Sequence, residues 1–172
     1  MCIRDRCLEP GTDLRRWLRV AEIALAVGAE VVPLTAAEHD DAVAAISAVP
    51  HLLAAALATA AADAGPLALS LAAGSFRDGT RVIASDPAFV TALVEGNAGP
   101  ARVALDRVLD QLDRPVAELV AAGHAVRAAP APGRRAVRVP LERSALLALG
   151  RSGGAVTQRL AAFVEGWVPD TP

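Results

Sequence analysis

Apolar residues recur at helical spacing along most of this 172-residue chain, and glycine and proline separate the helices that they predict. The first helix runs from Leu14 to Val27, with Thr12 or Asp13 as its cap. The β-branched run Glu30–Leu34 then predicts a short strand. A single helix and strand cannot bury the edges of a sheet. We therefore expect this pair to be the tail of a larger α/β domain.

The central part of the chain begins at Thr35, which forms a capping box with Glu38. The helix that it opens should run to Val49. Pro50 should end or kink it, because proline lacks a backbone N–H, and a second helix should continue to Ala64. Further helices are expected at Leu67–Ala73, at Ala88–Glu95, from Gly99 to about Ala122 with a break at Pro115, and as a pair within Glu142–Val164, while Ala136–Val139 is a candidate strand.

The composition favours close packing of helices over a core of large side chains. Hydrophobic residues make up 53% of the chain and aromatic residues only 3%. The net charge of −2 provides no general attraction for nucleic acid or an anionic membrane. The uncharged stretch Ala42–Ala62 is long enough to cross a membrane. Its alanine content and its central Pro50 and His51 instead favour a helix buried between neighbours or in a dimer, so we expect no membrane partner.

The residue types exclude several kinds of chemistry. All 17 basic residues are arginines, which excludes Schiff-base catalysis by lysine. The guanidinium groups that remain can hold carboxylates through two hydrogen bonds. The three histidines and the two cysteines do not show the spacing of metal ligands, so we expect no metal site. With no signal peptide and so few cysteines, we expect a reduced, cytoplasmic setting.

The segment Gly74–Pro87, GSFRDGTRVIASDP, gathers glycine, an aromatic ring, two arginines and aspartate in a chain that is otherwise mostly small and apolar. It resembles the GGF(K/R)DxTR…SDP signature of prephenate dehydrogenases. The resemblance implies that Arg81 is the principal anchor for a substrate carboxylate. Asp78 would hold Arg81 extended through an ion pair, and Gly74 would allow tight backbone geometry near the ligand. From composition alone, Arg81 would be a surface arginine paired with Asp78 or Asp86.

His51 is the second candidate for a substrate contact. A single histidine beside proline on an apolar helix is by default a core or interface residue. The same family, however, carries an SHxPH segment whose last histidine faces the substrate cleft. This chain reads Ser47-Ala48-Val49-Pro50-His51, so His51 is kept and Ala48 replaces the earlier histidine. Two further residues match the family pattern. We interpret His39 as a local capping residue or a residue packed between domains. Asn97 matches a family position, and a cap at a helix end would explain it equally well.

The resemblance covers Leu14 to His124 and implies a mainly α fold. That fold is a helical dimerisation domain of the prephenate/6-phosphogluconate dehydrogenase C-terminal type, preceded by a helix–strand remnant of a Rossmann domain. Residues 1–34 would comprise a non-native start, Met1–Arg6, and the tail end of a dinucleotide-binding domain. Residues 35–124 would form the helical substrate-binding and dimerisation domain, and residues 125–172 a C-terminal extension.

The resemblance further implies a fragment of an enzyme that oxidises and decarboxylates prephenate to 4-hydroxyphenylpyruvate with NAD or NADP, on the route to tyrosine. The sequence has no GxGxxG turn. We therefore expect a missing domain to bind the cofactor and carry the catalytic histidine, and this chain to supply substrate binding and a homodimer interface. Two alternatives stay open: a fragment of an arogenate dehydrogenase, and a non-catalytic helical dimerisation module.

Overall fold

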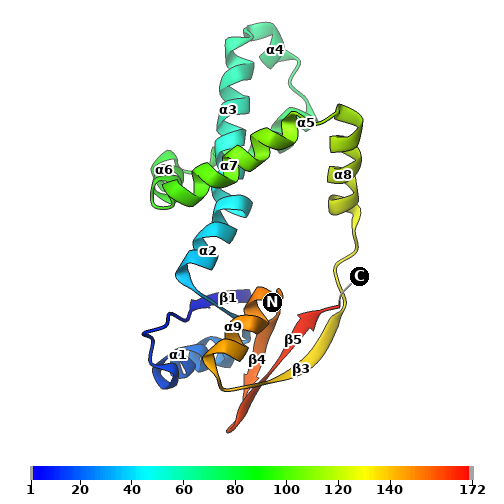
Figure 1. Cartoon of the computed structure of the whole chain (residues 1–172). Helices are drawn as coiled ribbons and strands as arrows, with labels where there is room; N and C mark the ends of the chain where they lie inside the picture. The colour runs from blue at the N-terminus through cyan, green and yellow to red at the C-terminus, as the bar shows by residue number, and fades with distance from the viewer. Residues whose placement is uncertain (1, 171–172) are drawn as a thin grey trace. The chain divides into compact units, whose positions relative to one another are not determined.

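The computed structural model describes residues 2–170 and divides the chain into two compact units (Figure 1). The first unit joins Met1–His39 to Ala125–Pro172 and contains a sheet with two helices. The second unit is Asp40–His124 and consists of helices joined by short loops. The mainly α fold that the sequence predicts is therefore confirmed.

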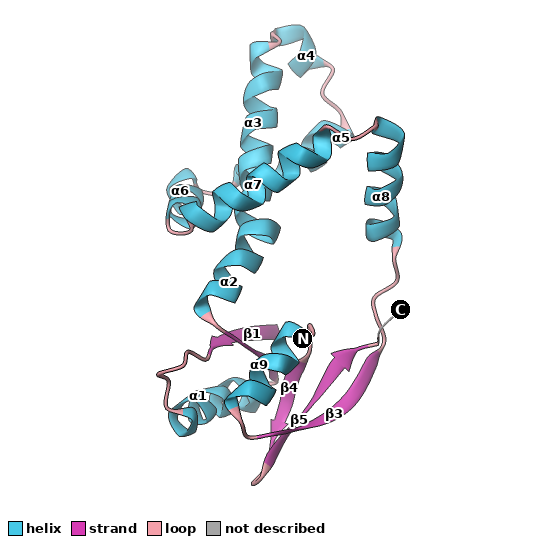
Figure 2. Cartoon of the chain, in the orientation of Figure 1, coloured by secondary structure: helices cyan, strands magenta, loops and turns pink. Residues whose placement is uncertain are grey.

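A five-stranded sheet lies at the centre of the first unit, in the order β1-β2-β4-β5-β3 (Figure 2). The strands are β1 (Cys2–Cys7), β2 (Ala29–Leu34), β3 (Arg134–Pro140), β4 (Ala155–Arg159) and β5 (Phe163–Pro169). The pair β1–β2 is parallel, and the other three pairs are antiparallel. The sheet is thus assembled from segments near both ends of the chain.

Two helices, α1 (Leu14–Ala26) and α9 (Arg143–Arg151), pack on this sheet and share one hydrophobic core with it. Asp13 caps α1 by accepting a hydrogen bond from the backbone N–H of Arg16 at 3.0 Å. Gly150 lets α9 approach β2, because a Cβ at this position would lie 1.7 Å from the carbonyl oxygen of Pro33. The buried core residues are Leu8, Trp17, Leu18, Ala21, Ala24, Ala29, Val31, Leu146, Leu147, Leu149, Val156 and Val164.

The ends of the chain fold differently from our expectation. The segment Cys2–Cys7, most of which we placed in a start outside the fold, pairs along its length with β2. The residues after 124, expected as a separate extension, supply three strands and a helix of the same unit. The helical pair expected within Glu142–Val164 is wrong in its second half, because Gly153 (φ 76°) follows α9 and two strands succeed it. Pairing with distant strands outweighs the helix propensity of that run.

The boundary between the two units, at residues 39 and 40, falls within α2. The elements of the second unit are α2 (Ala36–Val43), the π-helical turn η1 (Ala44–Ala48), α3 (Val49–Asp63), α4 (Pro66–Ser70), α5 (Gly74–Thr80), the 3₁₀ turn η2 (Arg81–Ala84), α6 (Pro87–Glu95), α7 (Ala98–Leu112) and α8 (Val116–Ala128). α2 starts in the first unit, and α8 runs back into it.

The capping box at the start of α2 is confirmed. The backbone N–H of Thr35 donates to Glu38 Oε2 at 2.8 Å, and the backbone N–H of Glu38 donates to Thr35 Oγ1 at 3.3 Å. Arg151 of α9 donates to the other oxygen of the same carboxylate. The pKa of Glu38 is lowered to about 2 by these hydrogen bonds. The bond from the Thr35 N–H has the largest effect, followed by those from the Arg151 side chain and the Thr35 hydroxyl.

Pro50 does not end the helix as we expected. α2, η1 and α3 run on without a break from Ala36 to Asp63, and η1 lies immediately before Val49 and Pro50. Proline has no N–H for the helical ladder and its ring crowds the preceding turn. A π-helical turn changes the hydrogen-bonding register by one residue at this place, so the chain continues past the proline.

We predict that Glu38→Gln weakens the fold at neutral pH and removes part of its acid sensitivity. Because the pKa of Glu38 is about 2 in the folded chain against an ordinary value of 4.5, its contribution to stability is present above about pH 4.5. That contribution is lost as the pH falls from about 4.5 towards 2. The measurement is the free energy of unfolding between pH 2 and pH 7, at intervals of about half a pH unit. It is obtained from denaturant unfolding followed by circular dichroism.

Glu95→Gln is the control, since Glu95 is exposed and has no ion pair within residues 2–170. Parallel pH profiles for the parent chain and Glu38→Gln would contradict this assignment.

Candidate functional site

The predicted motif forms one continuous surface segment. Gly74 begins α5, Asp78 lies in its last turn, and Arg81 begins η2. The Thr80 hydroxyl donates to the carbonyl oxygen of Phe76 at 2.8 Å and closes this turn. Both α5 and η2 pack against α3. The glycine, the carboxylate and the guanidinium are therefore held together on a helical support.

Arg81 is exposed and forms no ion pair within the described part of the chain. The expected pair with Asp78 is not formed. Asp86 is engaged elsewhere: its Oδ1 accepts from the backbone N–H groups of Ala88 at 2.8 Å and Phe89 at 3.2 Å and caps α6. The ion pair with Asp78 or Asp86 that composition alone suggests for Arg81 is therefore not formed among the described residues. Its guanidinium keeps all five donors for an anion from outside the chain.

His51 lies in the first turn of α3 and is half-buried. Its Nδ1 is 2.8 Å from the carbonyl oxygen of Ser47. A carbonyl oxygen only accepts, so Nδ1 carries the proton in this hydrogen bond. Nε2 then presents a lone pair, or a second N–H when the ring is charged. The hydrogen bond fixes the ring and leaves one nitrogen for a ligand.

Gly74 has no conformational reason to be glycine within this chain. Its φ is not positive, unlike those of Gly28, Gly65 and Gly153. A Cβ at Gly74 would meet nothing within 4 Å. The space beside it is open to a ligand or to another protein surface. Gly79, by contrast, faces α3, where a Cβ would lie 3.4 Å from Leu57 Cδ2.

The structure groups Gly74, Asp78 and Arg81, and it places His51 on the helix that supports them. No hydrogen bond or ion pair joins His51 to Arg81 or Asp78 within residues 2–170. The two parts of the predicted site are thus connected through α3 rather than through direct contact.

Asn97 has a role that the sequence did not specify. It occupies the N-cap position of α7, but its side chain makes no capping hydrogen bond there. Its Nδ2 donates instead to the carbonyl oxygen of Asp40 in α2, at 2.7 Å. This hydrogen bond ties the start of α7 to α2, one turn before η1. The sequence singled out Asn97 only through its match to a family position. The alternative interpretation, that its side chain caps a helix end, is wrong.

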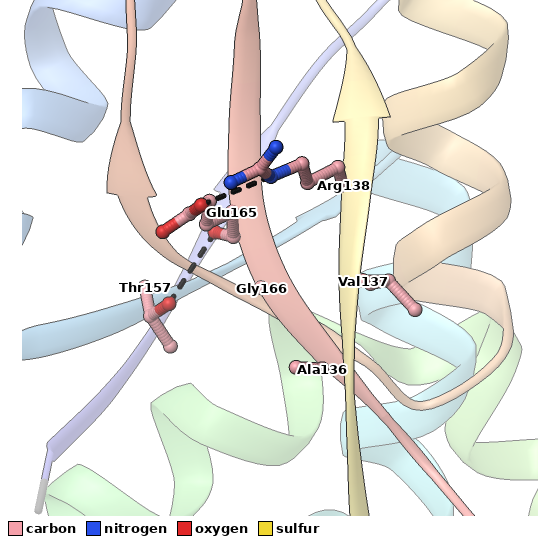
Figure 3. Close-up of a pocket in the computed structure, with 6 residues that line it drawn as sticks. All are labelled: Ala136, Val137, Arg138, Thr157, Glu165 and Gly166. Atoms are coloured by element: carbon pink, nitrogen blue, oxygen red, sulfur yellow. Dashed lines mark hydrogen bonds and ion pairs between the residues drawn. The ribbon is translucent and has the colours of Figure 1, made fainter.

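A different hollow lies on the sheet of the first unit. It has a volume of about 380 Å³ and is lined by Ala136, Val137, Arg138, Thr157, Glu165 and Gly166. Figure 3 shows its polar groups turned towards one another. Arg138 Nε pairs with Glu165 Oε1 at 3.1 Å, and Thr157 Oγ1 donates to the carbonyl oxygen of Glu165 at 3.3 Å. None of the residues singled out from the sequence lines this hollow.

The described residues also show no cluster suited to a metal ion. Among the described side chains, no group of three or more His, Cys, Asp or Glu residues could hold a metal ion. His39 pairs with Asp5, at 3.0 Å, rather than with a second histidine.

The similarity to a known protein family lies in the helical part of the chain. Residues 35–126 match the family model of the prephenate dehydrogenase dimerization domain. Among curated protein sequences, none is significantly similar to the chain.

Three solved structures share the fold. A Corynebacterium glutamicum protein assigned to the prephenate dehydrogenases is 41% identical, with a TM-score of 0.64 over 73% of this chain and 44% of that one. The arogenate dehydrogenase of Synechocystis is 27% identical, with a TM-score of 0.61 over 73% and 46%. A prephenate dehydrogenase from A. aeolicus, in complex with hydroxyphenyl propionate and NAD+, is 22% identical, with a TM-score of 0.61 over 72% and 44%. The chain spans less than half of each of these proteins.

We predict that Gly74→Ala leaves the free energy of unfolding within about 1 kcal/mol of the parent value, because the added methyl group meets nothing and alanine favours a helix. Gly150→Ala is the contrasting variant. Its Cβ would overlap the backbone of β2, and we expect a loss of about 3 kcal/mol or more. Denaturant unfolding measures both. Equal destabilisation by the two substitutions would show that a side chain at position 74 meets other atoms, which would contradict the open space beside Gly74.

Proposed function

Because this chain belongs to the prephenate dehydrogenase family, we propose that it supplies the substrate-carboxylate site and the dimer interface of a prephenate dehydrogenase. The reaction is the oxidative decarboxylation of prephenate to 4-hydroxyphenylpyruvate with NAD or NADP, a step of tyrosine biosynthesis in the cytoplasm. The observation that carries the proposal is the unpaired guanidinium of Arg81 at the centre of the motif.

The chemistry of the substrate matches this arrangement. Prephenate carries two carboxylates, and a guanidinium binds a carboxylate through two parallel hydrogen bonds. Arg81 has no competing carboxylate within the described chain, so it meets the substrate without first breaking an internal ion pair. Asp78, three residues before it, leaves the local charge close to neutral. Gly74 keeps the neighbouring surface open, and His51 offers Nε2 as a further polar contact.

Arogenate is the second candidate substrate. It differs from prephenate by an amino group in place of the keto oxygen, and the Synechocystis relative is an arogenate dehydrogenase. The carboxylate site that we assign to Arg81 would serve either molecule. Identification of the substrate therefore depends on groups beyond Arg81.

NAD or NADP would accept the hydride in this reaction. The A. aeolicus relative binds NAD+, but this chain contains no glycine-rich turn of the kind that cradles a dinucleotide pyrophosphate. The residues present do not fit the cofactor, so we assign none of them to it and derive no step through it. The role of this chain is to bind and orient the substrate.

A homodimer follows from the surface of the helical unit. Its large exposed apolar side chains are Ile46, Leu53, Leu57, Leu67, Leu69, Leu71, Phe89, Val103, Leu109, Leu112, Val116 and Val120. Its buried core is limited to small residues around Ala44, Val49 and Ala104. So much exposed apolar surface marks an interface, and the matched family domain is a dimerization domain.

The long helix formed by α2, η1 and α3 also fits a different interpretation, a segment that crosses a membrane. The continuous helix Ala36–Asp63 is long and apolar enough to cross a membrane by length and composition. Two of its residues, Ala44 and Ala48, are fully buried against other helices of the unit. The family domain that includes this helix supports packing against a second copy rather than against lipid.

We predict that Arg81→Ala weakens binding of 3-(4-hydroxyphenyl)propionate at least about tenfold, because hydrogen bonds to a charged group contribute roughly 1.5–3 kcal/mol. Arg81→Lys should recover only part of the loss, since an ammonium group cannot reproduce the planar fork. Titration of the isotopically labelled chain, followed by NMR chemical shifts, gives the dissociation constants.

Arg77→Ala is the matched control, because Arg77 is an exposed arginine in α5, directly before η2, and should matter little. If the parent chain failed to bind the ligand, or if both alanine variants bound within about twofold of the parent, the assignment of the carboxylate site to Arg81 would be wrong.

A further inference from the structure

Strand β3 lies at an edge of the sheet, and no strand pairs with its outer side within residues 2–170 (Figure 2). Its residues are exposed, except that Val137 and Val139 are partly buried. An edge strand presents backbone N–H and C=O groups that can pair with another extended chain. The outer side of β3 is therefore open to a further strand.

The pairing with β5 determines which backbone groups of β3 point outwards. The backbone N–H of Asp170 donates to the carbonyl oxygen of Gly133 at 2.9 Å, so Gly133 is directed towards β5. This direction alternates along an antiparallel ladder. Ala136 and Arg138 therefore turn their N–H and C=O groups to the outer edge. Pro140, the next outward residue, has no N–H and ends the row.

Two arginines of β3 lean over the sheet and leave this edge unshielded. Charged side chains on an edge strand normally hinder pairing with another chain. Here Arg138 extends over β5, where its Nε lies 3.1 Å from Glu165 Oε1 and its guanidinium 4.9 Å from the centre of the Phe163 ring (Figure 3). The guanidinium of Arg134 lies 3.9 Å from the centre of the Trp167 ring. Both charges are thus held over β5 rather than over the outer side of β3.

Arg135 supplies the charge that an incoming strand would meet. It is exposed and has no ion pair within the described residues. Side chains alternate between the two faces of a strand, so Arg135 shares a face with Val137 and Val139. Both valines pack against the core that the sheet shares with α1 and α9. A strand added here would meet one cation and two partly buried valines on this face.

We propose that the outer edge of β3 binds an extended acidic segment of another protein, which becomes a sixth strand of this sheet. The backbone of the segment pairs with Ala136 and Arg138. An aspartate or glutamate lies beside Arg135, and apolar side chains lie beside Val137 and Val139 and extend the core. In antiparallel addition the segment reads apolar-x-apolar-x-acidic from its N-terminus. This inference is independent of the substrate site and of the homodimer proposed above.

An acidic segment fits this edge better than a second copy of β3 does. The copy would bring Arg134, Arg135 and Arg138 with it, and like charges on adjacent strands destabilise their pairing. The carboxylate of Glu165 on the neighbouring strand is already engaged by Arg138. A carboxylate from outside the chain is therefore the group that complements Arg135.

The test titrates the full 172-residue chain, isotopically labelled, with the peptide acetyl-Thr-Val-Thr-Val-Thr-Glu-amide. The peptide has the apolar-x-apolar-x-acidic order, and its β-branched residues favour an extended backbone. NMR should show the largest shift changes and slowed hydrogen exchange at the amides of Ala136 and Arg138. The same peptide with lysine in place of glutamate should bind about threefold more weakly or worse, because it places a like charge beside Arg135.

Methylation of the peptide backbone distinguishes edge pairing from other modes of binding and leaves the protein unchanged. The threonine nitrogens face β3 in antiparallel addition, and the valine nitrogens face away. Methylated threonine nitrogens should weaken binding about tenfold or more, because hydrogen bonds are lost and the methyl groups keep the strands apart. Methylated valine nitrogens should be tolerated.

A charge reversal in the protein tests the partner's chemistry. Arg135→Glu should make the lysine peptide the tighter ligand of the two. Arg107→Glu is the matched control, because it makes the same charge change at an exposed position of α7 and should leave the preference for the glutamate peptide intact. Circular dichroism checks that both variants keep the fold.

An absence of binding up to about 1 mM peptide would overturn the proposal. So would equal weakening by the two methylated peptides, or a preference that Arg135→Glu leaves unreversed. Ala136→Pro removes an outward N–H that the sheet does not use. If this variant lowered the mass of the assembled chain in sedimentation equilibrium, the occupant of the edge would be a second copy and the acidic partner would be wrong.

Discussion

The helical unit is constrained by how little apolar surface it can bury by itself. Its buried residues are mostly alanines together with Val49, and several leucines and valines of α3, α4 and α7 are exposed. Burial of apolar area is the main favourable term in folding, and a unit of this size has little stability to spare. The sheet unit is different, because α1 and α9 enclose a continuous core with it. The helical unit therefore leaves exposed the apolar surface that the proposed second copy would cover.

The same close packing positions the segment Gly74–Pro87, to which we assign substrate binding. η1 carries the fully buried Ala44 and Ala48 against α7, and Asn97 ties α7 back to α2. These contacts fix the start of α3, where the hydrogen bond from His51 to Ser47 orients the imidazole ring. Farther along, α3 supports α5 and η2, which present Arg81. The binding site that we propose thus rests on backbone geometry set by a π-helical turn and by the hydrogen bond of the Asn97 side-chain amide.

Local chemistry predicted the helices and their caps well. Asp13 and the Thr35–Glu38 box make the hydrogen bonds expected of them, because a cap depends on residues within one turn. The failures involve distant partners. Strand pairing across the sheet recruits residues from both ends of the chain, and the accommodation of Pro50 depends on the packing around η1. The motif identified Arg81 as chemically special, but only the fold shows that Asp78 and Asp86 leave it unpaired.

The concentration dependence of unfolding tests the central claim most directly. If the helical unit is completed by a second copy, folding is coupled to association and the midpoint of thermal unfolding rises with protein concentration. We predict a steady rise from about 1 to 100 µM, together with a dimeric mass by sedimentation equilibrium across the upper part of that range. A monomer whose helices unfold cooperatively at the same temperature throughout the range would contradict the account, because it would show that the exposed leucines and valines need no partner.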